Sequence, residues 1–131
     1  MEGWFPNCLK EGEEVNFLAL PLHHIFSIVN FFLFLKLGAD SVLVPFPRSI
    51  DEMVKVFKDT KPSAFFGINP LFDAISEHKT ANQIDFSSLK ISLAGTVPLR
   101  QDVFEKWKKI TGHSILEVYT ITEACGFAAI K

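Results

Sequence analysis

The chain alternates short apolar runs with amphipathic stretches, and this rhythm predicts its secondary structure. Five apolar runs have the length of buried strands, namely residues 15–20, 41–46, 63–68, 90–94 and 114–119. Because these runs are continuously apolar rather than alternating, they are typical of parallel strands that are covered on both faces. We therefore expect an α/β fold, with a mostly parallel sheet of about five strands and helices on both faces.

Helical stretches connect the predicted strands. The clearest follows Ser49, an N-cap residue with Glu52 three positions later, because apolar residues then recur at helical spacing. The other helices are expected to begin near His24, at Asn69 as the N-cap residue, and at Pro98. We divide the chain into a lead-in segment, residues 1–14, and one α/β subdomain, residues 15–131.

Composition narrows the class of protein. The 131 residues are 48% hydrophobic and 21% charged, which is typical of a globular chain. The formal net charge of −2 argues against a nucleic-acid partner, because nucleic-acid-binding domains are usually basic. Fourteen Phe against two Trp and one Tyr indicate much dry apolar surface, since the Phe ring has no hydrogen-bonding group.

The cysteines and the longest apolar stretch bear on location. Cys8 and Cys125 lie far apart and form no metal-binding motif, which favours a reducing, cytoplasmic setting. Residues 25–35 would rise roughly 16 Å as a helix, whereas the hydrocarbon core of a bilayer is about 30 Å thick. We therefore predict no membrane span.

Three loops follow the carboxyl ends of predicted strands, where α/β sheets bind ligands. The first contains His23 and His24, whose side chains diverge and cannot hold one metal ion from one face; ordinary helix-entry residues are the simpler interpretation. The second contains Gly95, which is typical of a strand-to-helix turn and would also allow close backbone approach to a flat ligand.

The third loop carries the largest variety of groups that could bind a ligand. Tyr119 offers an aromatic face, Thr122 a hydroxyl and Glu123 a carboxylate. These groups suit a nucleotide base, phosphate oxygens and Mg²⁺ respectively. Thr and Glu are also ordinary helix-start residues. The three loops together favour a ligand site more than any one of them does.

The segments LPLHHIF, AGTVPL and YTITEA, at these separations, resemble the adenylate-forming superfamily of acyl-CoA synthetases, luciferases and peptide-synthetase adenylation domains. From about Val15 to Gly126 the chain looks most like bacterial long-chain fatty acid–CoA ligases. The resemblance implies a Rossmann/flavodoxin-like subdomain. It also implies a two-step reaction in which a fatty acid attacks ATP to give acyl-AMP, and coenzyme A then forms the thioester, with Mg²⁺ as the metal.

The resemblance also implies roles for individual residues. Tyr119 and Thr120 fall at the adenine contact, Thr122 at a catalytic phosphate contact, and Glu123 at the catalytic carboxylate that binds Mg²⁺. The loop that lies beside adenine and forms one wall of the acyl pocket is matched by Gly95, Thr96 and Val97. A catalytic histidine near the reacting carboxylate is matched by His24. The acyl pocket itself is matched by His24, Phe26 and Ile28. Family members usually have Gly at the position of Thr120, and often at that of Thr96.

The sequence contains no Ser/Thr/Gly-rich phosphate loop that ends in Lys. We therefore expect an internal piece of the large N-terminal domain of such a ligase, without turnover of its own. Two alternatives remain, a non-catalytic flavodoxin-like nucleotide-binding domain and an interaction domain that self-associates through apolar surface.

Overall fold

The computed structural model describes residues 7–44, 49–124 and 126–130. The order of elements is β1 (Val15–Leu18), α1 (Ile25–Lys36), β2 (Asp40–Leu43), α2 (Ile50–Thr60), β3 (Ala64–Gly67), α3 (Asn69–Ser76), η2 (Ala81–Gln83), β4 (Ile91–Ala94), α4 (Gln101–Thr111), β5 (Ile115–Ile121), η3 (Thr122–Ala124) and β6 (Gly126–Ile130). The elements η2 and η3 are single 3₁₀ turns.

The strands form one sheet in the order β2-β1-β3-β4-β5-β6. The first five strands are parallel, and β6 pairs antiparallel with β5. The carboxyl ends of β1, β4 and β5 therefore lie along the same edge of the sheet. The pairing of β4 with β5 ends at Glu117, and the part of β5 beyond it pairs with β6.

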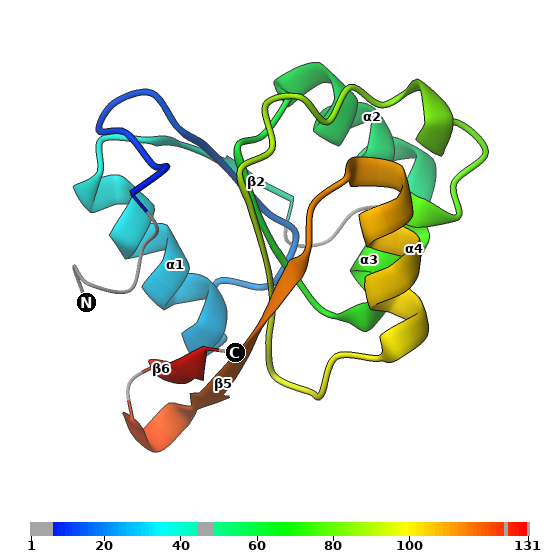
Figure 1. Ribbon diagram of the computed structural model, residues 1–131. Helices are drawn as coiled ribbons and strands as arrows, with labels where there is room; N and C mark the ends of the chain where they lie inside the picture. Colours follow the sequence, from blue (N-terminus) through cyan, green and yellow to red (C-terminus); the bar gives the residue numbers. More distant parts are fainter. Residues whose placement is uncertain (1–6, 45–48, 125, 131) are drawn as a thin grey trace.

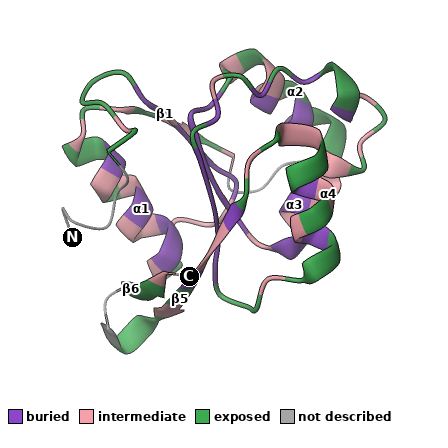
Figure 2. Cartoon of the chain, in the orientation of Figure 1, coloured by how far each residue is buried: buried purple, intermediate pink, exposed green. Residues whose placement is uncertain are grey.

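Helices cover both faces of the sheet, as predicted. Figure 1 shows α1 alone on one side and α2, α3 and α4 together on the other. Alternate strand residues divide between two cores: Phe17 and Phe65 face the three-helix side, whereas Leu18 and Phe66 face α1. The central strands β1, β3 and β4 are largely buried, as Figure 2 shows.

Edge-to-face and tilted aromatic contacts account for much of the Phe surplus. Phe65 lies 4.8 Å from Phe72, 5.6 Å from Trp107 and 5.8 Å from Phe17 between ring centroids. The fully buried Trp107 donates its indole N–H to Ser92 Oγ at 3.1 Å, which satisfies the one polar group of the cluster. The Phe residues of this cluster therefore serve the core.

Glu14 ties the lead-in segment to the sheet. Its side chain is buried and accepts hydrogen bonds from Lys90 Nζ at 2.6 Å and from the Lys10 N–H at 2.7 Å. Burial alone raises the pKa of Glu14, but the hydrogen bonds from Lys90, Ser63 and the Lys10 N–H, with the charge of Lys90, bring that pKa below its ordinary value of 4.5.

Two helix starts agree with the prediction. Ser49 Oγ accepts the Glu52 N–H at 3.1 Å, so the predicted N-cap of α2 is confirmed. His24 is the N-cap residue of α1, and its Nδ1 accepts the Phe26 N–H at 3.2 Å. His24 thus has the helix-entry role that the sequence favoured.

Two other helix starts were predicted wrongly. Ile68 rather than Asn69 is the N-cap residue of α3, because the Asn69 amide bonds to a distant loop instead. The fourth helix begins at Gln101, three residues after Pro98, because residues 98–100 have backbone partners outside the helix.

The strands also differ from the prediction in extent. The antiparallel β6 was not predicted, and β5 continues through Thr120 to Ile121, so Thr120 lies in a strand rather than in a loop. The second strand ends at Leu43, and residues 45 and 46 of the predicted run lie outside the described residues. Within the described ranges, no helix combines the length and apolar character needed to cross a bilayer.

Candidate functional site

A cavity of about 340 Å³ lies beside the carboxyl ends of β4 and β5. Its walls come from the loop after β4, the second half of β5 and one residue of β6: Thr96, Val97, Pro98, Glu117, Val118, Tyr119, Thr120 and Ala129. The structure therefore brings together four of the predicted binding residues, Thr96, Val97, Tyr119 and Thr120. The volume lies at the lower end of the range of about 300–1,000 Å³ that is usual for small-molecule pockets.

Tyr119 is an exposed residue of the cavity wall. The side chain is 62% exposed, on a strand whose neighbouring Val118 is buried against α1. The pairing of β5 with β6 shifts register between Tyr119 and Thr120, which is typical of a β-bulge. Positive φ occurs among the described non-glycine residues at Lys61 and Thr96, so Thr120 accommodates its β-branched side chain at an ordinary φ.

The loop after β4 is strained at one residue. Thr96 has a φ of 73°, in the left-handed region that strongly disfavours β-branched residues. Its side chain is exposed at the cavity, as is that of Val97. Thr96 thus has a backbone conformation that Gly would adopt freely.

Gly95 links this loop to α1. A Cβ at Gly95 would lie 2.8 Å from Phe26 Cε2, closer than real Cβ contacts come. The absence of a side chain therefore makes room for the Phe26 ring, while the close ligand approach expected from the sequence stays a prediction. Phe26 is fully buried and belongs to the core beside α1. The start of α1 and the loop after β4 are thus direct neighbours.

The other predicted site residues lie outside the walls of this cavity. His24 is exposed at the start of α1, and Ile28 is partly buried one turn further along. Thr122 and Glu123 are exposed on η3, directly after β5. The described residues contain no group of three or more His, Cys, Asp or Glu side chains that could hold a metal ion.

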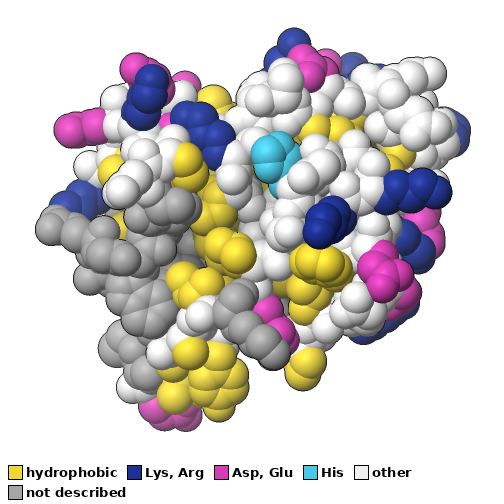
Figure 3. All heavy atoms as spheres, in the orientation of Figure 1, with side chains coloured by type: hydrophobic (Ala, Val, Ile, Leu, Met, Phe, Trp, Pro, Cys, Tyr) yellow, Lys and Arg dark blue, Asp and Glu magenta, His cyan; other side chains and the backbone are white. Residues whose placement is uncertain are grey.

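Glu117 is the functional candidate that the sequence interpretation missed. It lines the cavity, and its Oε1 accepts the Leu99 N–H at 3.0 Å from the loop opposite. A charged residue within the apolar run SILEVY was the available signal. On the face shown in Figure 3, basic and acidic side chains are interspersed rather than gathered into one basic surface.

Comparison with known proteins shows to which family this chain belongs. The profile of a family described as AMP-binding enzyme matches residues 1–131. A long-chain-fatty-acid–CoA ligase of Escherichia coli O6:H1 is 40% identical over 124 residues, which make up 94% of this chain. The ligase of the same name from Haemophilus influenzae is 41% identical over 121 residues, or 87% of this chain. The chain spans 22% of the length of each of these relatives.

Solved structures show the same fold. The N-terminal domain of FACL13 from Mycobacterium tuberculosis, with an inhibitor bound, matches 95% of this chain and 30% of its own with a TM-score of 0.82 at 11% identity. The anthranilate CoA ligase AuaEII in complex with anthranoyl-AMP matches 94% of this chain and 24% of its own with a TM-score of 0.82 at 22% identity. At these identities the likeness establishes the fold.

Proposed function

The chain belongs to the AMP-binding enzyme family, and from that premise we propose that it forms the adenine side of the nucleotide site of a long-chain fatty acid–CoA ligase. One observation carries the proposal: the exposed residue Tyr119 lines the same cavity as Thr96 and Val97. An exposed aromatic ring at a mostly apolar cavity suits a flat heterocyclic base. The identity of about 40% to bacterial ligases supports the long-chain substrate class.

The residues after β5 suit the phosphates and Mg²⁺. Mg²⁺ is usually held by one or two carboxylates together with substrate phosphates, so a single carboxylate at Glu123 fits it. Thr122 would donate its hydroxyl to a phosphate oxygen. When bound, Mg²⁺ would neutralise the negative charge of the phosphates. Such neutralisation, together with positioning of the reactants, accounts for most of the catalysis of phosphoryl transfer.

His24 is proposed to hold the fatty carboxylate. Its Nδ1 accepts the Phe26 N–H, so in the neutral ring the proton resides on Nε2. An exposed Nε2–H donor suits a carboxylate oxygen. Phe26 and Ile28, from the first turn of the same helix, are proposed for the acyl side of the site. Cytoplasmic location, with peripheral contact at the inner membrane face as an alternative, belongs to the same proposal.

The experiment is a titration of the 131-residue chain with ATP, followed by NMR at the only tyrosine. Stacking of adenine should shift the Tyr119 ring signals upfield, and Tyr119→Ala should weaken binding by roughly tenfold. Phe32→Ala is the matched control, because Phe32 is 58% exposed on α1, away from the cavity. Unchanged Tyr119 signals at saturating ATP would contradict the proposed site.

We further propose that these 131 residues do not turn over alone. The sequence holds no phosphate loop ending in Lys, so the groups that stabilise a charged transition state are incomplete. Pyrophosphate release with ATP, palmitate and coenzyme A should equal that of a blank. Release above the blank by the purified chain would refute this part.

Self-association is a second candidate, favoured by apolar side chains on the surface. Phe32 and Leu35 on α1 are more than half exposed, and Leu43 on the edge strand β2 is 42% exposed. Such surface drives association between copies. Light scattering should show particles larger than 14.8 kDa at high concentration, and a monomer throughout would exclude this candidate.

A further inference from the structure

The loop after β4 is held by side chains from two other elements. Pro98 O accepts the Asn69 Nδ2–H at 3.0 Å, and the Arg100 N–H donates to Asn69 Oδ1 at 3.1 Å. Between them, the Leu99 N–H donates to Glu117 Oε1 at 3.0 Å. Three successive residues of the loop therefore each have one backbone group bound to a side chain, from α3 on one side and from β5 on the other.

The chemistry of Asn69 fits this position. The side chain supplies one donor and one acceptor from the same amide plane, and it uses both on the loop. Asn69 is only 8% exposed, so water competes little for these bonds. Both bonds are part-buried, so the loss of either would leave a backbone group of the loop without its side-chain partner, at a cost in free energy. Asn69 thus fixes the loop rather than capping its own helix.

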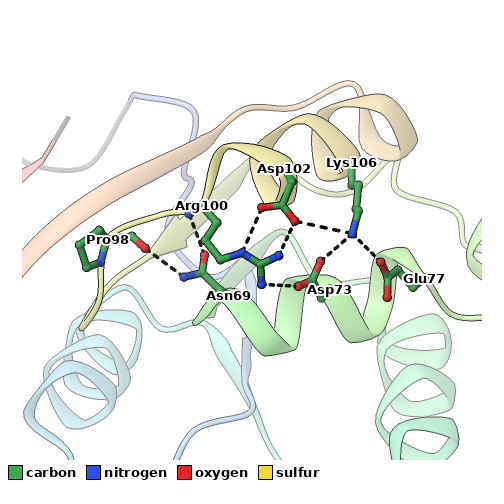
Figure 4. A network of polar contacts seen from close by, with 7 residues as sticks. All are labelled: Asn69, Asp73, Glu77, Pro98, Arg100, Asp102 and Lys106. Carbon is green, nitrogen blue, oxygen red and sulfur yellow. Dashed lines mark hydrogen bonds and ion pairs between the residues drawn. The ribbon is translucent and has the colours of Figure 1, made fainter.

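Ion pairs form an outer layer around this contact, as Figure 4 shows. Arg100 Nη1 lies 3.2 Å from Asp73 Oδ2, and the guanidinium also pairs with Asp102, which lowers the pKa of that carboxyl. Lys106 Nζ lies 3.3 Å from Asp73 Oδ1 and 2.5 Å from Glu77 Oε1. Solvent screens exposed pairs of this kind, so each contributes little to stability. The buried amide of Asn69 is therefore the main restraint on this side.

We propose that Asn69 and Glu117 are positioning residues that together fix the loop at residues 95–100, so that Thr96 and Val97 face the Tyr119 ring across the cavity. The strained φ of Thr96 makes this restraint necessary, because a released loop would relax away from 73°. The inference rests on the proposed nucleotide site for its ligand readout, whereas its structural readout is independent of any ligand.

Amide hydrogen exchange measured by NMR on the 131-residue chain tests the structural part. In Asn69→Leu the Arg100 N–H should exchange roughly tenfold faster, and in Glu117→Leu the Leu99 N–H should do so, because each loses its acceptor. Glu117→Gln retains a side-chain oxygen and should stay within about threefold of the original rate. Asn82→Leu, at an exposed Asn of η2, is the matched control.

Binding of ATP tests the functional part. Asn69→Leu and Glu117→Leu should each raise the Kd at least about fivefold, Glu117→Gln should restore it to within about twofold, and Asn82→Leu should leave it unchanged. Unchanged loop exchange in both leucine variants overturns the inference, and so does faster loop exchange with an unchanged Kd.

Two further outcomes are decided by the same measurements. If the original chain binds no ATP, the proposed nucleotide site fails, and the exchange rates of Leu99 and Arg100 still decide whether the loop is held as described. Loss of protection at core amides such as that of Phe65 in Asn69→Leu would indicate global unfolding. Asn69→Ala and the Glu117 variants then decide the matter, and global loss in all of them overturns a positioning role.

Discussion

Thr96→Gly is the substitution that tests the strain in the cavity loop most directly. Thr96 has a φ of 73°, and its side chain is exposed. Removing the side chain therefore forfeits little burial, while it removes the clash between Cβ and the backbone that makes this region unfavourable. The variant separates backbone strain from packing.

The magnitude follows from two opposing contributions. The left-handed conformation costs an L-residue roughly 1–2 kcal/mol. Glycine gains more freedom in the unfolded chain, which lowers the free energy of unfolding by roughly 0.5–1 kcal/mol. The net expectation is a stabilisation of about 0.5–1 kcal/mol, or roughly 2–4 °C in Tm for a chain of this size.

Urea unfolding followed by the fluorescence of the buried Trp107 measures the change, with the m-value checked for constancy. Val97→Gly is the matched control, because Val97 is the exposed, β-branched neighbour without positive φ. It should lower the free energy of unfolding by about 0.5–1 kcal/mol. Equal losses of stability in both variants would refute the argument from strain.

Three other substitutions test the packing, electrostatics and capping described above. Gly95→Ala should lower the free energy of unfolding by about 1–3 kcal/mol, because the new Cβ would meet the Phe26 ring. In a double-mutant cycle, adding Phe26→Leu should recover part of that loss, and additive losses would contradict the contact. Glu14→Gln should make folding less sensitive to acid. Because the pKa of Glu14 is lower in the folded than in the unfolded chain, its carboxylate stabilises the fold above pH 4.5, and this stabilisation is lost as the pH falls through the folded pKa. Identical acid titrations of both chains, followed by circular dichroism, would argue against this role. Ser49→Ala should cost about 1 kcal/mol in thermal unfolding through loss of the N-cap, and no change would speak against that cap.

The sequence predicted those features that depend on neighbours along the chain. Continuous apolar runs predicted the five parallel strands because a buried parallel sheet tolerates few polar positions. Ser49 was predicted as an N-cap residue because its partner lies three residues away. The loops after β1, β4 and β5 were predicted to form one ligand site because parallel strands end at a common edge. Tyr119, Thr96 and Val97 line one cavity there, whereas His24, Thr122 and Glu123 lie outside its walls.

Features that depend on distant partners were missed or misjudged. The partners of Asn69 lie 29 and 31 residues further along, so its local pattern indicated a helix cap instead. Nothing in the residues around Gly95 indicates that the ring of Phe26 occupies the space of its missing side chain. The strand β6 was missed because its five residues follow a 3₁₀ turn and have no typical hairpin-turn sequence.

The place of Tyr119 in the sheet has a consequence for motion. Beyond Glu117, β5 has left its parallel neighbour and is bonded to β6 alone, as a two-stranded ribbon at the margin of the sheet. Isolated ribbons of this kind are only marginally stable. Val118 is buried in the core beside α1, so we expect the ribbon to fray from Tyr119 onward while Val118 keeps its place in that core. The cavity wall that contains Tyr119 can then open by local unfolding, which needs far less free energy than unfolding of the whole chain.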